Sequence, residues 1–260
     1  MKHAVLALLG AFTLAAHAAP DALRVCADPD NLPYSRQDGS GFENRIAQLL
    51  ADDMHVPLSY AWLPDRRGFV RKTLGAQLCD VIIGVPVQFE RAATTHPYYR
   101  SAYVIVERAG DAPPVRSLRD PRLAGMRIGV QLIGNDMAAS PPGEVLAREG
   151  HTQNVRGFPL AGEAPSAQRA VDAIARGEID AAVLWGPQAA YFAKRAPLPL
   201  RVNALDAAAD AHFDFAIAMG VRRGDKELRA QLDDFVSRRQ GDIDRILAEY
   251  DVPRAPGAVR

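Results

Sequence analysis

The residue types that most often do chemistry in proteins are few in this sequence, and they are scattered. No Gly-x-Ser-x-Gly elbow, glycine-rich phosphate loop or recognisable Ser/His/Asp grouping occurs. Residues 28–31 (DPDN) resemble a calcium loop, but the glycine and the bidentate glutamate of such loops are missing. The histidines beyond residue 20 stand singly rather than in the short-spaced pairs that zinc sites use: His55, His96, His151 and His212. We therefore expect no catalytic residues, no metal site and no cofactor.

The composition is that of a folded, globular chain. Its 260 residues are 48% hydrophobic and 24% charged, which disfavours a disordered or low-complexity protein. The 31 Lys and Arg residues balance 31 Asp and Glu residues, so no net field draws the chain to a phosphate backbone. Nucleic-acid binding is therefore disfavoured, and the length suggests one large domain or two modest ones.

The first nineteen residues have the pattern of a secretory signal peptide. Lys2 and His3 form a short basic start, residues 4–15 are almost all apolar, and residues 16–18 (AHA) have the small-x-small pattern of a cleavage site. The apolar run is shorter than the ~20 residues that a membrane span needs. We therefore expect residues 1–19 to be removed and the mature protein to be soluble in the periplasm.

Cys26 and Cys79 are the two cysteines of the chain. Export favours a disulfide between them. The expected strand register argues against one, because Cys26 lies two residues before Asp28 and Cys79 lies five before Gly84. If both strands end at the same edge of a sheet, that stagger is about 10 Å at ~3.3 Å per residue, beyond the ~7 Å limit between Cα atoms. A strand that begins late or bends would relax this estimate, so both states remain open.

Short apolar runs alternate with helical patterns, which is typical of an α/β protein with largely parallel sheets. A linker-like stretch at residues 109–114 separates two such sets. Strands are expected at residues 23–27, 58–62, 81–85, 103–107, 127–130, near 155, 181–185 and 213–221. Helices are expected to begin near 41, 69, 143, 166 and 187, with two closing helices at 225–235 and 242–250.

Motifs along most of the chain resemble those of type II periplasmic binding proteins of family 3, the amino-acid class. They occur in the order of that class, at residues 23–28 (LRVCAD), 41–43 (GFE), 79–86 (CDVIIGVP), 90–91 (ER), 95–101 (THPYYRS) and 178–184 (EIDAAVL). The resemblance implies an α/β fold with two lobes joined by two crossing segments around a cleft. We expect lobe 1 to comprise residues 20–107 and 212–260, and lobe 2 to comprise residues 108–211.

The same resemblance implies roles for cleft residues. Arg91 stands where the class keeps the arginine that binds a ligand carboxylate, and Asp28 stands at the acidic position that ends the first strand. Gly84 supplies backbone at the cleft edge. An α-amino acid needs such an arginine for its carboxylate and an acid for its ammonium. The cleft candidates from the second lobe are Gln131, Asn135, Asp136 and Trp185.

Two positions depart from the amino-acid pattern. Pro86 stands where the class often offers a hydroxyl, and it supplies neither hydroxyl nor N–H. Gly186 stands where a second-lobe aspartate pairs with the ligand ammonium, and its loss costs several kcal/mol unless a group such as Asp136 replaces it. An ordinary α-amino acid is therefore a weak candidate ligand.

Structural roles stay open for the same candidates. Arg91 is equally suited to an ion pair with Glu90 or Asp80 on the surface. Asp28 is suited to cap the turn that ends its strand. Trp185 is suited to packing beside the cleft.

Longer blocks resemble a narrower group, the MoxJ/XoxJ accessory proteins that accompany periplasmic quinoprotein (PQQ) methanol dehydrogenases. The blocks are residues 62–71 (WLPDRRGFVR), 128–136 (IGVQLIGND), 184–188 (LWGPQ), 216–224 (AIAMGVRRG) and 246–250 (ILAEY). This resemblance implies a non-enzymatic partner of the dehydrogenase or of its cytochrome c. The alternative is a solute receptor that delivers a small ligand to an ABC importer.

The first of these blocks combines basic and aromatic residues, a mixture enriched at protein interfaces. The partner-binding candidates are Trp62, Arg66, Arg67, Phe69 and Arg71. A solvated helix start is the alternative interpretation.

Overall fold

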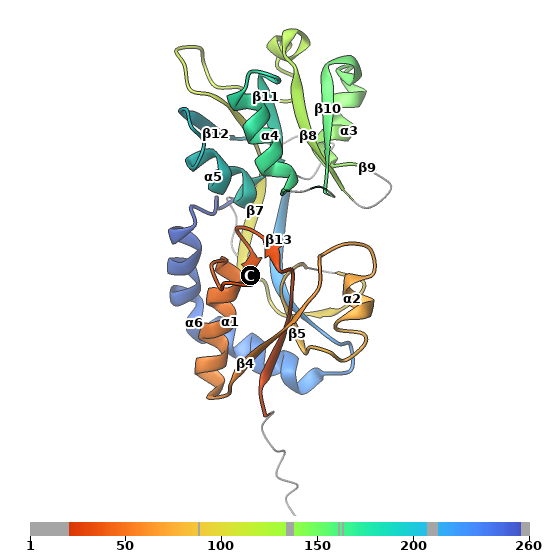
Figure 1. The fold of residues 1–260 in the computed structure, drawn as a ribbon, viewed down its shortest axis with the longest axis vertical. Helices are drawn as coiled ribbons and strands as arrows, with labels where there is room; N and C mark the ends of the chain where they lie inside the picture. Colours follow the sequence, from red (N-terminus) through yellow and green to blue (C-terminus); the bar gives the residue numbers. More distant parts are fainter. Residues whose placement is uncertain are drawn as a thin grey trace, which may run out of the picture.

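The structure is a computed structural model that describes residues 21–87, 89–133, 138–160, 162, 164–206 and 213–255. The predicted signal peptide, two of the cleft candidates (Asn135 and Asp136) and the predicted boundary at 212 lie outside the described residues. Figure 1 shows two α/β lobes stacked along the long axis, with β7 (Tyr99–Arg108) and β13 (Asp214–Val221) running between them.

The sheet of the first lobe has the order β4 (Leu58–Trp62), β1 (Leu23–Ala27), β5 (Val81–Pro86) and β13. β1 runs parallel to β4 and β5, whereas β13 runs antiparallel to β5 and also pairs with β6 (Ala93–Thr94). One face is covered by α1 (Phe42–Met54) and α6 (Lys226–Glu249), which contact each other. α2 (Phe69–Lys72) covers the other face, and a hairpin of β2 (Asp30–Asn31) and β3 (Ser35–Arg36) follows β1.

The sheet of the second lobe has the order β10 (Val155–Pro159), β8 (Ile128–Ile133), β11 (Ala181–Trp185), β7 and β12 (Leu200–Ala204). The helices α4 (Ser166–Ala175) and α5 (Gly186–Lys194) pack on one face. α3 (Pro141–Arg148) packs on the other face, where β9 (Ala138–Ala139) pairs with β8. Two short 3₁₀ helices, Pro121–Gly125 and Thr152–Asn154, complete this lobe.

The strand β7 belongs to both sheets. Residues 99–102 pair with β13, and residues 103–108 pair with β11 or β12. A boundary at residue 107 would therefore divide β7 within its pairing to the second sheet. The assignment of 20–107 with 212–260 to one lobe and 108–211 to the other stays a prediction.

The residues that follow α6 return to the second lobe. The Tyr250 ring stacks on Tyr191 of α5 at 6.4 Å between centroids, and Asp251 pairs with Lys194 at 2.6 Å. The Ser101 hydroxyl on β7 donates to the Pro253 carbonyl at 2.7 Å. The C-terminal segment is thus a further connection between the lobes beside β7 and β13.

Two expectations about local structure need correction. The closing pair of helices is one continuous helix, α6, and Gly241 lies inside it rather than at a break. The register argument against the disulfide was also wrong, because Cys26 and Cys79 are bonded with their Cα atoms 5.3 Å apart. Cys79 lies two residues before β5, which begins at Val81. It is therefore outside the strand, and a distance calculated along a straight strand does not apply to it.

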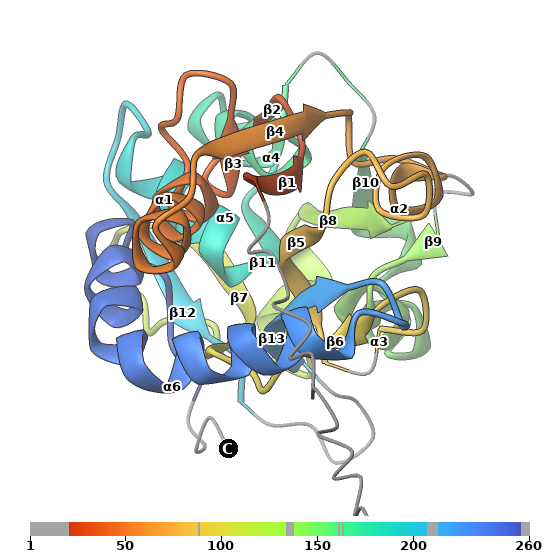
Figure 2. The same cartoon turned by 90° about the horizontal axis from the view of Figure 1, so that it is seen from below.

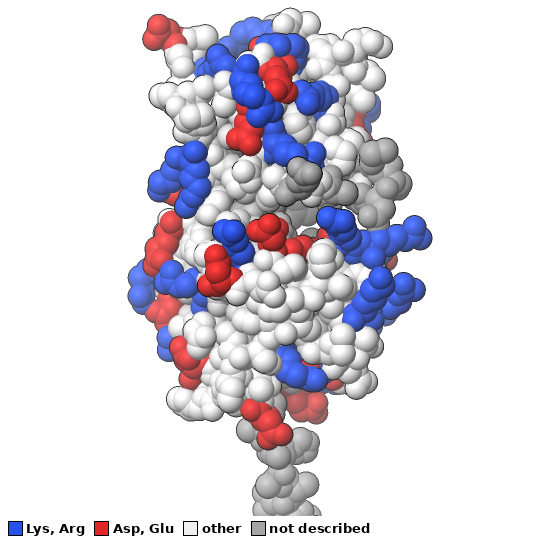
Figure 3. Space-filling model, viewed as in Figure 1, with Lys and Arg blue, Asp and Glu red and all other residues white. Residues whose placement is uncertain are grey.

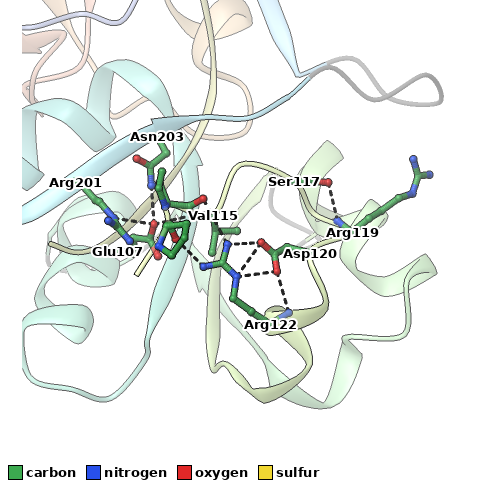
Figure 4. A network of polar contacts seen from close by, with 10 residues as sticks. Glu107, Val115, Ser117, Arg119, Asp120, Arg122, Arg201 and Asn203 are labelled. Atoms are coloured by element: carbon green, nitrogen blue, oxygen red, sulfur yellow. Dashed lines mark hydrogen bonds and ion pairs between the residues drawn. The ribbon is translucent and has the colours of Figure 1, made fainter. Parts of the chain in front are cut away.

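A buried carboxylate connects the end of β7 to its neighbours in the second lobe (Figure 4). Glu107 is 7% exposed, and its Oε1 accepts bonds from Val115 N at 3.0 Å, Asn203 Nδ2 at 2.7 Å and Arg201 Nε at 3.0 Å. This group therefore holds β12 and the segment after residue 108 against β7.

None of the helices among the described residues has the length and apolar character of a membrane span.

Candidate binding cleft

A cavity of about 520 Å³ lies where the two lobes meet the crossing strands. This volume is within the range of small-molecule sites, roughly 300–1,000 Å³. The second lobe contributes Ile133, Pro141 and Trp185, while β7 and β13 contribute Tyr99, Tyr103, Phe215 and Ile217. The remaining lining residues come from the first lobe: Cys26, Ala27, Asp28, Asn31, Tyr34, Ser35, Glu43, Asp65, Phe69, Ile82, Gly84, Val85 and Pro86.

Two of the acidic lining residues are linked through the turns that follow neighbouring strands. Asp28 follows β1, and its Oδ1 accepts a bond from Asp30 N at 2.9 Å. Its Oδ2 accepts a bond from Asp65 N, just after β4, at 2.6 Å. Asp28 therefore caps the turn after its strand and also faces the cavity. Desolvation, together with the negative charge of Asp28, raises the pKa of Asp65 to about 6.

The third acidic residue is Glu43, the second residue of α1. Its carboxyl lies against the backbone of Gly84, where a Cβ atom would come within 2.1 Å of Glu43 Oε1. Desolvation, with a smaller contribution from the charge of Asp65, raises the pKa of Glu43 to about 8. The contacts among the described residues include no hydrogen bond or ion pair to this carboxyl. Gly84 thus serves the cleft by leaving room for the Glu43 side chain.

Aromatic rings form much of the remaining wall. Tyr103, Trp185 and Phe215 contact one another edge to face, with centroids 5.4, 5.8 and 6.4 Å apart. Tyr34 and Tyr99 flank Phe42 at 5.3 and 6.2 Å. Because these rings come from both lobes and from the crossing strands, the wall depends on the lobe arrangement seen here.

The family of bacterial extracellular solute-binding proteins, family 3, matches residues 23–251. The chain belongs to this family. Protein MoxJ of Methylorubrum extorquens is 34% identical over 92% of this chain and 84% of its own length.

Two solved structures are similar over 90% of this chain and 100% of theirs. The periplasmic binding protein XoxJ from Methylobacterium extorquens AM1 shares 36% identity with a TM-score of 0.77. MxaJ from Methlophaga aminisulfidivorans MPT shares 27% identity with a TM-score of 0.78. The predicted family and the two-lobed α/β fold are therefore confirmed, as is the likeness to the MoxJ/XoxJ group.

The predicted cleft residues occupy different environments. Asp28, Gly84 and Trp185 line the cavity, whereas Arg91 is exposed in a turn and is not among the lining residues. Glu90 and Asp80 were the two surface partners considered for Arg91. Asp80 is already paired with Arg24 at 2.6 Å and with Arg222 at 2.8 Å.

Gln131 is buried behind the cavity and is fully used by its own lobe. Its Nε2 donates to Ser166 Oγ at 3.0 Å and to Gln188 Oε1 at 2.9 Å, and its Oε1 accepts from Trp185 N at 2.7 Å. Gln188 Nε2 in turn reaches Asn31 Oδ1 in the first lobe at 3.5 Å. Gln131 therefore positions the start of α5 and is not among the residues that line the cavity.

The predicted partner patch is only partly on the surface. Arg66, Arg67 and Arg71 are exposed around the start of α2, where Figure 3 shows basic side chains at the right edge of the molecule. Phe69 is only 6% exposed and packs beside the disulfide, so it belongs to the core and the cavity wall. Trp62 is half-buried and stacks on Tyr60 at 4.4 Å.

Glu43 and Asp65 are functional candidates that the sequence patterns did not identify. Glu43 lies in the motif GFE at 41–43 and Asp65 in the block WLPDRRGFVR at 62–71. Both motifs were used for the family resemblance, and neither acid was considered as a cleft residue. Their positions in the chain were the available signal. Loops and helix starts that follow parallel strands lie together at one edge of the sheet, where Asp28 also lies.

Proposed function

We propose that this protein is a periplasmic, non-enzymatic binding-type protein that acts as a partner of a PQQ-dependent methanol dehydrogenase or of its cytochrome c. The observation that carries the proposal is the similarity to MoxJ along 92% of the chain. The similarity to XoxJ, a periplasmic binding protein, supports the same compartment. The signal pattern at residues 1–19 is consistent with export.

The cleft gives a second reason to prefer a partner over an amino-acid receptor. The described lining residues include three acids and no lysine, arginine or histidine. An α-amino acid brought into this cavity would place its carboxylate near Glu43 and Asp65, and none of the described lining residues is a cation that could pair with it. Delivery of an amino acid to an ABC importer is therefore the weaker proposal.

The exposed arginines at the start of α2 are the docking surface that we propose for the partner. Arg66, Arg67 and Arg71 form a basic patch beside the cavity mouth, where Asp65 is exposed. Charged residues at an interface rim mainly speed association and orient the partner. The proposed contact should therefore weaken as ionic strength rises.

A binding experiment with purified components tests the proposal. The mature protein is immobilised, and a PQQ methanol dehydrogenase and its cytochrome c are passed over it at low and at physiological salt. We expect saturable binding of one of them, weakened about tenfold by the double variant Arg66→Glu/Arg67→Glu. The matched control is Arg116→Glu/Arg229→Glu, which reverses two exposed arginines elsewhere and should leave the affinity unchanged.

Calorimetry with the twenty standard amino acids completes the test. We expect no micromolar binding of any of them. Micromolar binding of one amino acid, together with no binding of dehydrogenase or cytochrome, would overturn the partner proposal and restore the importer receptor.

A further inference from the structure

The cavity between the lobes has an unusual balance of charge for an amino-acid-type fold. Asp28, Glu43 and Asp65 all line it, and the described part of the lining contains no cationic side chain. Arg91, the residue expected to neutralise a ligand carboxylate, lies outside the cavity and is exposed. Arg66 lines a separate, smaller pocket that shares Asp28 and Asp65 with this cavity. Within the cavity itself, the acids favour positive charge and disfavour a carboxylate.

The arrangement of the acids argues for an organic cation over a metal ion. Among the residues that the structure describes, no group of three or more His, Cys, Asp or Glu is placed to hold a metal. The three carboxyls are instead distributed along a cavity of about 520 Å³, which is much larger than one ion. A ligand with several heavy atoms is needed to fill that space.

The Glu43 carboxyl is a fixed acceptor that the fold leaves without a partner. The end of its side chain rests on Gly84, and no donor from the described residues reaches it. A carboxyl held in a poorly solvated place gains most from a cation that arrives beside it. The raised pKa of Glu43 agrees with a carboxyl that has no cation or hydrogen-bond donor beside it.

The aromatic wall supplies the second half of a cation site. Trp185, Tyr103 and Phe215 face the same cavity as the acids and hold one another edge to face. Aromatic rings attract ammonium and alkylammonium groups through their quadrupole, and tryptophan does so best. Alkyl groups on the nitrogen would bury against these rings at the same time.

We propose that the cleft binds a small organic cation, an alkylated or quaternary ammonium compound that carries no carboxylate. The ammonium lies between the Glu43 carboxyl and the rings of Trp185 and Tyr103, and Asp65 faces it from the mouth of the cavity. This inference does not depend on the dehydrogenase proposal, because it concerns the isolated protein.

Calorimetric titration with choline, tetramethylammonium, methylammonium and putrescine tests the proposal. We expect at least one to bind with a dissociation constant below about 1 mM, a readily measurable free energy. The neutral isostere of choline, 3,3-dimethyl-1-butanol, should bind at least tenfold more weakly than choline. Glycine betaine, which adds a carboxylate to the same trimethylammonium group, should also bind at least tenfold more weakly.

Two variants assign the binding to this cavity. Glu43→Gln keeps the shape of the side chain and should weaken binding of the best cation at least tenfold at pH 8.5, where the Glu43 carboxyl is ionised. Trp185→Leu should weaken it by a similar factor, since an aliphatic side chain has no ring quadrupole. Glu144→Gln, on the exposed surface of α3, is the matched control and should leave the affinity unchanged.

The proposal is overturned if none of the four cations binds at 10 mM, or if the neutral isostere binds as tightly as choline. It is also overturned if small cations fail to bind while Glu43→Gln weakens capture of the dehydrogenase. In that case, a cationic side chain of the protein partner occupies the cleft.

Discussion

Glu43 should make the stability of the folded protein depend on pH in an unusual direction. Its pKa is raised from 4.5 to about 8 in the folded state, so the folded protein keeps a proton that the unfolded chain releases above pH 4.5. The stabilisation from this group is therefore complete below pH 4.5 and is lost as the pH rises toward 8. Asp65, with its pKa raised to about 6, acts in the same direction at lower pH.

The size of this effect follows from the pKa difference. Each pKa unit corresponds to about 1.4 kcal/mol, so the full difference for Glu43 is about 5 kcal/mol. Glu43 is partly accessible from the cavity, and water there screens its charge. We therefore expect the free energy of unfolding to fall by about 2 kcal/mol between pH 5 and pH 8.5 because of this residue.

Urea unfolding of the wild type and of Glu43→Gln across that pH range measures the effect. The variant should match the wild type near pH 5 and exceed its free energy of unfolding by about 2 kcal/mol at pH 8.5. Glu144→Gln should keep the wild-type slope. Parallel curves for the wild type and Glu43→Gln would show that the carboxyl is already ionised in the folded protein, and would refute the reasoning.

Changes at three other places in the structure have expected outcomes. Replacing Cys26 and Cys79 by serine should lower the free energy of unfolding by about 4 kcal/mol in urea, because the bond joins positions 53 residues apart. Two free thiols in denatured, unreduced wild type would contradict the bond. Glu107→Ala should cost about 3 kcal/mol in thermal unfolding, because three donors, two of them buried, lose one acceptor, and Glu107→Gln should cost less. Gly84→Ala should displace the Glu43 carboxyl and reduce its pH-dependent slope, and an unchanged slope would contradict that contact.

Much of the fold could be predicted because burial leaves a periodic trace in the sequence. The run at residues 81–85 predicts a strand covered on both faces, and the alternation of strands and helices predicts parallel sheets. The prediction of two closing helices was wrong. Gly241 lies within α6, where a single glycine weakens a helix by only about 1 kcal/mol, and packing of α6 on α1 outweighs it.

The disulfide could not be derived because it depends on a loop. The position of Cys79 relative to Cys26 is set by how the chain turns before Val81, and periodicity carries no information about that turn. A register estimate holds only while both residues remain in their strands.

The cleft was harder to predict than the fold. Asp28 follows the end of β1, Trp185 ends β11, and Gly84 lies within β5, so the sheets fix the positions from which all three reach the cavity. Arg91 lies on an exposed turn, where its direction is set by local backbone geometry that a motif does not record. Glu43 was missed because its importance comes from its contact with Gly84, 41 positions away in the chain, which only the folded structure shows.

The C-terminal segment gives the cleft a front and a back. Tyr250, Asp251 and Pro253 fasten the lobes together on the side of α5 and α6, and the Gln188–Asn31 contact also joins the lobes. Figures 1 and 2 show α2 and β9 on the side away from α1 and α5. The interlobe contacts named above therefore lie on one side of the cavity, and the basic patch at the start of α2 lies on the other. A partner docked on that patch, as proposed, stands beside the cavity, so its arrival and departure govern the exchange of a ligand with solvent.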